Sequence, residues 1–301
     1  MVTKFKMEQK DMTVLFILSV LHNIIFSFVL TLSSASKNDC YKPNSNFINT
    51  ENALDIDFES INKSEITDTK FVNLKLNAKN VLEIPVPFQI LTDLREYFDK
   101  YVEPYLVEGK YVGGLKLPGK YKFYCVAPNN WSSDIQWISV DSRSTYDYFV
   151  PYFKDIGLDD IFKDIIDVEK EIVIYNVFFV VRSKCEQHKW HIDFYRGTNV
   201  NAFTFLTPLQ DKNYINLAYR DLNNEEQLYE YKRGTAIVFG ENFMHSTNVT
   251  PKSDREVLFC LSFGTDNLRD WEVIRQTAAV QGNYYMHPIR GYTNIQDTVS
   301  L

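Results

Sequence analysis

The stretch Ile172-Val-Ile-Tyr-Asn-Val-Phe-Phe-Val-Val181 consists almost entirely of β-branched and aromatic residues. Such a run predicts a β-strand that is covered on both faces. More strands are expected at short intervals, separated by Gly, Asn and Asp turns: at 121–126, 202–206, 215–219, 227–231, 236–239 and 256–263. Many short strands of this kind predict a mainly β fold with a jelly-roll barrel.

Helices are expected to flank the sheet. Apolar residues recur at spacings of three and four in three segments, 88–105, 158–166 and 268–278. This spacing places the apolar side chains on one helical face. Asp159 and Asp160 stand in the first turn of the second helix, where negative charge is favourable. The apolar face of each helix would pack on the β core.

Candidate metal ligands follow the first long strand. On a β-strand alternate residues share a face, so His191 and Asp193 would project together, while His245 would come from another strand. Two imidazoles and one carboxylate leave coordination positions open, as in non-haem Fe(II) enzymes, whereas a structural zinc site is closed. His-x-Asp also arises by chance, so its surroundings carry the argument.

A further strand is predicted after the second histidine, in Arg255-Glu-Val-Leu-Phe-Cys-Leu-Ser-Phe263. Period two places Arg255 on one face with Val257, Phe259, Leu261 and Phe263. A guanidinium on an apolar face needs an acidic partner, and its planar fork suits a carboxylate. That acid is either an incoming dicarboxylate or a neighbouring Asp or Glu, and the dicarboxylate is the preferred interpretation.

In order and spacing these residues resemble the Fe(II)/2-oxoglutarate-dependent dioxygenases, and in motif layout their prolyl 4-hydroxylase-like branch. Two further segments look similar to that branch, Ala202-Phe-Thr-Phe-Leu-Thr-Pro-Leu-Gln-Asp211 and Tyr231-Lys-Arg-Gly-Thr-Ala-Ile-Val-Phe239. The resemblance covers roughly 173–266. It departs from the prolyl 4-hydroxylase pattern in having Arg255 where Lys is usual and His188 where Tyr is frequent.

The resemblance implies a double-stranded β-helix with flanking helices and an oxygenase function. It implies that His191, Asp193 and His245 bind Fe(II) and that 2-oxoglutarate chelates the iron while its far carboxylate meets Arg255. Thr204 stands where related proteins place a hydroxyl near that carboxylate, although a packing role is equally open. Dioxygen would be the other cosubstrate. Because Asp193 is present, the resemblance favours hydroxylation, desaturation or oxidative cyclisation over halogenation.

Three functions remain open at this point. The first is oxidation of a C–H bond in a small molecule, and the second is a membrane-anchored lumenal protein hydroxylase of the prolyl 4-hydroxylase type. The third is a non-catalytic jelly-roll binding module, which would not call for Arg255. Substrate contacts at the barrel mouth are expected from residues around the first ligand pair and from nearby strands: Trp190, Tyr195, Arg196, Asn199, Arg182 and Arg220.

Composition sets the outer limits. The 301 residues are 45% hydrophobic and 15% aromatic, which is sufficient for one large domain with a sizeable core. The net charge of -7 offers no basic surface for nucleic acid, so nucleic-acid partners are disfavoured.

An N-terminal hydrophobic segment precedes the domain. Residues 12–32 carry no formal charge, and a membrane-spanning helix takes about 20 residues. We therefore expect an anchor or signal segment at 1–36, and with it a membrane-anchored location or one in the lumen of the secretory pathway. A linker is expected at 37–80, the oxygenase domain at 81–285 and a tail at 286–301.

Overall fold

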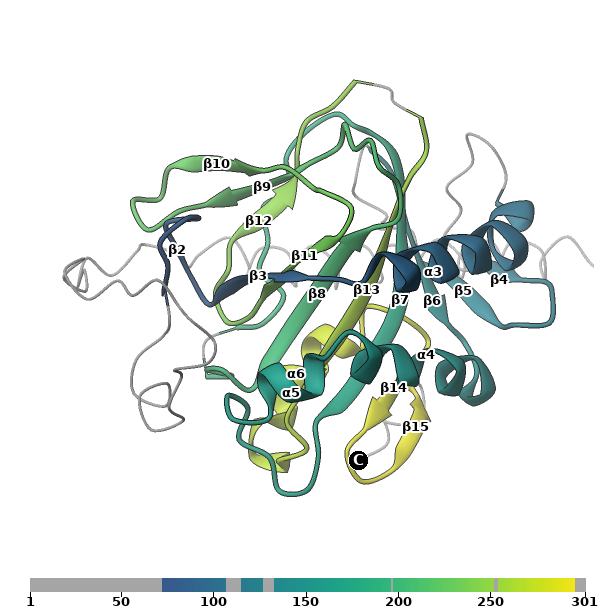
Figure 1. The fold of residues 1–301 in the computed structure, drawn as a ribbon. Coiled ribbons are helices and arrows are strands. Elements are labelled where there is room, and N and C mark those ends of the chain that lie inside the picture. Colours follow the sequence, from purple (N-terminus) through teal and green to yellow (C-terminus); the bar gives the residue numbers. More distant parts are fainter. Residues whose placement is uncertain (1–71, 107–114, 127–132, 196, 252–253, 296–301) are drawn as a thin grey trace, which may run out of the picture. The chain divides into compact units, whose positions relative to one another are not determined.

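The computed structural model describes residues 72–106, 115–126, 133–195, 197–251 and 254–295 (Figure 1). The predicted anchor or signal segment at 1–36 lies outside these residues. In the described part of the chain, no helix combines the length and apolar character needed to cross a membrane. The membrane or lumenal location therefore stays a prediction.

The described elements are fifteen strands, four α-helices and one 3-10 helix. The strands are β1 Val72–Asn73, β2 Ala78–Lys79, β3 Val81–Pro85, β4 Leu115–Leu117, β5 Phe123–Val126, β6 Ser133–Val140, β7 Val173–Cys185, β8 Ala202–Pro208, β9 Leu217–Arg220, β10 Glu226–Tyr229, β11 Thr235–Phe239, β12 His245–Thr247, β13 Glu256–Gly264, β14 Tyr284–His287 and β15 Gly291–Asn294. The helices are α3 Phe88–Tyr101, η3 Glu103–Tyr105, α4 Arg143–Asp155, α5 Leu158–Phe162 and α6 Leu268–Ala278.

Two antiparallel sheets form the barrel. The large sheet has the order β3-β11-β8-β13-β7-β6-β5-β4, and the small sheet has the order β10-β9-β12. An isolated bridge between His191 and His245 joins the His-x-Asp segment to the small sheet. Along the chain, β7, β8, β11 and β13 of the large sheet alternate with segments of the small sheet. This alternation is the double-stranded β-helix, and the predicted fold class is confirmed.

The large sheet is covered on both faces. One face packs on α3, α4 and α5, with Phe98, Phe149 and Phe162 among the helical side chains that enter that core. The opposite face carries Leu206 and Cys260 and faces the small sheet. Because both faces are covered, β7, β8 and β13 are buried almost without interruption.

Most predicted elements are present, and the structure adds short strands outside the predicted bounds of the domain. The closing helix matches α6, and the predicted helix at 88–105 is divided into α3 and η3. Strand β6 and helix α4 were not predicted, although α4 has buried side chains at a helical spacing. The short strands β1 and β2 fall in the predicted linker, and the hairpin β14–β15 extends into the predicted tail.

Candidate metal centre

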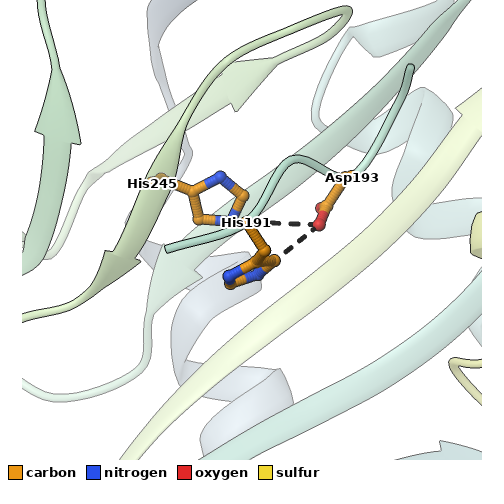
Figure 2. Close-up of side chains that lie close together, drawn as sticks. All are labelled: His191, Asp193 and His245. Carbon is orange, nitrogen blue, oxygen red and sulfur yellow. Dashed lines mark ion pairs between the residues drawn. The ribbon is translucent and has the colours of Figure 1, made fainter. Parts of the chain in front are cut away.

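Three side chains lie close together, His191, Asp193 and His245, and their candidate ligand atoms are all within 4.8 Å of one another (Figure 2). The Nε2 atoms of His191 and His245 lie 3.8 and 3.9 Å from Oδ1 of Asp193. Two ligands that each lie about 2.1 Å from an ion are at most about 4.2 Å apart, so both separations fit one ion. The sequence motif is therefore brought together as predicted.

The main chain places the two histidines opposite each other. His191 N donates to His245 O at 3.0 Å, and His245 N donates to His191 O at 2.9 Å. This reciprocal pair brings the ring centroids within 4.3 Å. Asp193 lies in a bend after the bridge and not in a regular strand, so a turn of the chain aims its carboxylate. The hydroxyl of Thr277 in α6 donates to the Asp193 carbonyl and ties this bend to the helix.

Both histidines are hydrogen-bonded in a way that suits metal binding. Nδ1 of His191 lies 2.7 Å from Lys189 O, and Nδ1 of His245 lies 3.0 Å from Phe243 O. A carbonyl oxygen is an acceptor, so Nδ1 carries the proton in each ring and Nε2 keeps its lone pair. Carbonyl partners of this kind orient a ligand histidine and raise its basicity.

Thr204 acts on the carboxylate ligand. Its Oγ1 donates to Oδ2 of Asp193 at 2.6 Å, which leaves Oδ1 to face the two imidazoles. A hydroxyl has one proton to donate. That proton is used on Asp193, so the structure gives Thr204 a different partner from the cosubstrate carboxylate that the resemblance implied.

Burial differs across the three ligands. His245 is buried, and desolvation together with the neighbouring His191 lowers the pKa of its imidazole to about 4. His245 is therefore neutral at pH 7, the form that binds a metal. The side chain of His191 is 33% exposed, so the centre is open to the surface on that side.

Arg255 lies away from the metal centre. It precedes β13, and its NH1 donates to the carboxylate of Glu103 in η3. Its companions by period two, Val257, Phe259 and Leu261, belong to the core beneath the helices. The prediction that Arg255 faces the barrel interior is therefore wrong, and the neighbouring acid that was weighed as its partner is Glu103.

The interior face of β13 is identified by its pairing. Ser262 pairs with Thr204, which contacts Asp193, and Cys260 pairs with Leu206 in the adjacent position. By alternation Glu256 shares this interior face, because no bulge interrupts β13 between Glu256 and Ser262.

An aromatic and charged cluster flanks the first ligand. The ring of Trp190 stacks on His188 with centroids 5.0 Å apart, and the Arg220 guanidinium lies 4.4 Å from a Trp190 ring centroid. Glu226 pairs with His188 at 3.1 Å and with Arg220 at 3.5 Å. These contacts place two of the predicted mouth residues, Trp190 and Arg220, side by side.

The other residues predicted to line the barrel mouth differ in their exposure. Tyr195 is exposed, and Asn199 sits in a left-handed turn whose backbone N–H is bound by Glu241. Arg196 lies outside the described residues. Arg182 is buried in the barrel interior and does not reach the surface. Thr277 was not predicted, because a threonine in an amphipathic helix carries no local sign of a partner 84 residues away.

Comparison with known proteins gave structural matches alone. No protein-family model matches the chain, and no curated protein does. Among solved structures, a Pseudomonas putida prolyl-4-hydroxylase is 12% identical, with 67% of this chain and 98% of that chain covered and a TM-score of 0.40. HygX from Streptomyces hygroscopicus, solved with nickel and 2-oxoglutarate, is 12% identical over 67% and 86%, with a TM-score of 0.39.

A third similar structure is the non-haem alpha-ketoglutarate-dependent carbocyclase SnoK from nogalamycin biosynthesis. It is 9% identical to this chain, over 70% of this chain and 87% of that chain, with a TM-score of 0.45. Identities this low leave the chemistry to be argued from the residues of this chain.

Proposed function

We propose that this protein is a 2-oxoglutarate-dependent non-haem Fe(II) dioxygenase that oxidises an unactivated C–H bond of a small molecule. The observation that carries the proposal is the convergence of His191, Asp193 and His245, whose candidate ligand atoms all lie within 4.8 Å of one another.

The donor set fits ferrous iron. Two imidazole nitrogens and one carboxylate oxygen on one side of an ion are the 2-His-1-carboxylate triad, which leaves positions for cosubstrate and dioxygen. A structural zinc site has four protein ligands, and within the described ranges the cluster offers these three. When bound, iron with 2-oxoglutarate and dioxygen would supply the oxidant for C–H cleavage.

The residues of the chain hold and shield this site. The carbonyls of Lys189 and Phe243 fix the imidazole tautomers, and Thr204 fixes the carboxylate. Phe239 and Phe243 pack against the His245 ring, with centroids 4.5 and 5.8 Å away, and exclude water from that side. The exposed side of His191, beside Trp190 and Arg220, is the proposed approach for substrate.

The test is metal binding and uncoupled cosubstrate turnover. Purified protein with Fe(II), 2-oxoglutarate and air should release succinate slowly, and candidate substrates should raise the rate. Asp193→Ala should lose both metal affinity and succinate release, whereas Leu228→Ala, an exposed position on β10, should keep both. If wild-type protein binds neither iron nor 2-oxoglutarate, the proposal is rejected.

Mass spectrometry of the product would then identify the reaction. A gain of one oxygen indicates hydroxylation, and a loss of two hydrogens indicates desaturation or cyclisation.

A further inference from the structure

The loop after Asp193 contains a tight turn that binds a buried carboxylate. Gly197 and Asn199 in this turn have positive φ values of 110° and 48°. N–H groups that a turn points to one side form an anion-binding concavity. Here the anion is the side chain of Glu241, because the Gly197 N–H donates to its Oε2 at 3.0 Å and the Asn199 N–H donates to the same atom. Glu241 is 2% exposed, so the protein itself fills the concavity.

Glu241 belongs to the segment that supplies the second histidine. It lies between β11 and β12, four residues before His245. Asn80 fixes the backbone here, because the Gly240 N–H donates to the Asn80 carbonyl at 2.9 Å and the Asn80 amide donates to the Glu241 carbonyl at 2.9 Å. The Asn242 amide donates to Oε1 of Glu241 at 3.0 Å. The carboxylate is therefore carried by a backbone whose position another part of the chain fixes.

Asp193 depends on loop contacts for its position. It lies in a bend and not in a strand, whereas the two histidines are joined by the reciprocal hydrogen bonds of their bridge. The Asn242 N–H donates to Phe194 O at 2.8 Å and attaches the beginning of the loop to the segment of His245. Glu241 attaches the end of the same loop. Asp193 is thus followed by two attachments to the segment of a partner ligand.

The metal centre tolerates little movement of this bend. Oδ1 of Asp193 lies 3.8 and 3.9 Å from the two Nε2 atoms, and two ligands that each lie about 2.1 Å from an ion are at most about 4.2 Å apart. The margin for the longer separation is therefore about 0.3 Å. Hydrogen bonds to an ionised carboxylate are roughly twice as strong as neutral ones, so the contacts of Glu241 are suited to resisting such a movement.

We propose that Glu241 is a positioning residue of the metal centre. Its carboxylate binds the turn at 197–199 and so holds Asp193 within reach of the ion that the two histidines bind. The inference deepens the proposed function and rests on it. Thr277 contributes differently, because its hydroxyl ties the Asp193 carbonyl to α6 and not to the segment of a second ligand.

The test separates metal affinity from stability. Glu241→Met keeps the length of the side chain and removes both acceptor oxygens. Competition with a chelator should show a nickel(II) affinity about 10- to 100-fold lower than that of the wild type, as for the loss of a group that orients a ligand. Glu241→Gln keeps one acceptor oxygen without the charge, so its affinity should lie between those two values. The visible absorption of bound cobalt(II) should change in Glu241→Met, because its coordination changes when Asp193 moves away.

Asp266→Leu is the matched control. The Asp266 carboxylate likewise accepts from backbone N–H groups, those of residues 169–171 at 2.6 to 3.2 Å, but that turn supplies none of the three candidate ligands. Urea denaturation of the metal-free proteins should show a loss of stability in both Asp266→Leu and Glu241→Met. Nickel affinity should fall in Glu241→Met alone.

The outcomes that would overturn the inference are distinguishable from failure of the proposed function. If Glu241→Met is less stable than the wild type but binds nickel as tightly, Glu241 only stabilises the loop. Equal losses of nickel affinity in Glu241→Met and Asp266→Leu would assign the effect to general destabilisation. If Glu241→Met does not fold, Glu241→Gln decides, and an affinity equal to that of the wild type overturns the inference. Wild-type protein that binds no divalent metal would reject the proposed function together with the inference.

Discussion

Each metal ligand has one atom committed to the protein and another facing the shared centre. The imidazoles of His191 and His245 use Nδ1 on backbone carbonyls, and the Asp193 carboxylate uses Oδ2 on Thr204. Backbone carbonyls cannot be removed by substitution, so Thr204 is the one of these three orienting groups that a point mutation can test.

Replacing Thr204 by valine should lower metal affinity by about 10- to 100-fold, the usual effect of losing a group that orients a ligand. Thr204→Ser keeps the hydroxyl and should bind metal nearly as wild type does. Competition with a chelator, using nickel(II) or cobalt(II), measures both. Equal affinities in the valine and serine variants would show that the 2.6 Å hydrogen bond does not position Asp193.

At the scale of the elements, the end of β13 lies in close contact with the segment before β8. Gly264 ends β13 opposite Ala202, and a Cβ at Gly264 would lie 2.1 Å from Asn201 O and 2.7 Å from the Tyr175 hydroxyl. Backbone atoms cannot move aside as a flexible side-chain end does. The strands can approach this closely because residue 264 is glycine.

Gly264→Ala should therefore lower the free energy of unfolding by at least about 1–3 kcal/mol, the usual cost of overpacking. Gly240→Ala is the graded comparison, because its Cβ would meet Ala202 O at 2.9 Å, and a smaller loss is expected. Urea denaturation followed by circular dichroism gives both values. A Gly264→Ala protein as stable as wild type would contradict the close approach.

Most strands of the barrel and the pair His191 and Asp193 were predictable from the sequence because both are local patterns. The orientation of Arg255 was not. Period two groups Arg255 with Val257 and Phe259 correctly, but every residue of β13 is buried, so polarity does not reveal which face meets the metal. The register with Thr204 decides that, and it depends on residues more than fifty positions away. Arg182 was considered only for the mouth, because nothing local shows that Tyr231 packs against it.

At the scale of the whole molecule, the metal centre adds a pH-dependent contribution to folding. The pKa of His245 falls from its ordinary value of 6.5 to about 4 in the folded protein. Between these values the unfolded chain binds more protons than the folded one, so stability rises with pH across this window. The contribution of His245 to the free energy of unfolding is fully present above pH 6.5 and is lost as the pH falls from 6.5 through 4.

In chelator-treated protein we expect a loss of about 3 kcal/mol of unfolding free energy between pH 7 and pH 4 that depends on His245. Denaturation at a series of pH values across this range should show that the free energy of unfolding changes less with pH in His245→Gln, because glutamine does not titrate. Parallel slopes for the two proteins would assign the acid sensitivity to other groups.

The reciprocal hydrogen bonds between His191 and His245 belong to peptide groups, which every amino acid except proline possesses. The backbone geometry therefore fixes where the side chains at positions 191 and 245 lie, whichever residue types stand there. Replacing either imidazole by a carboxylate or a thiolate would change which metal ion the site prefers, while the position of the site would stay the same. The same barrel backbone could therefore hold different sets of metal ligands without a change of fold.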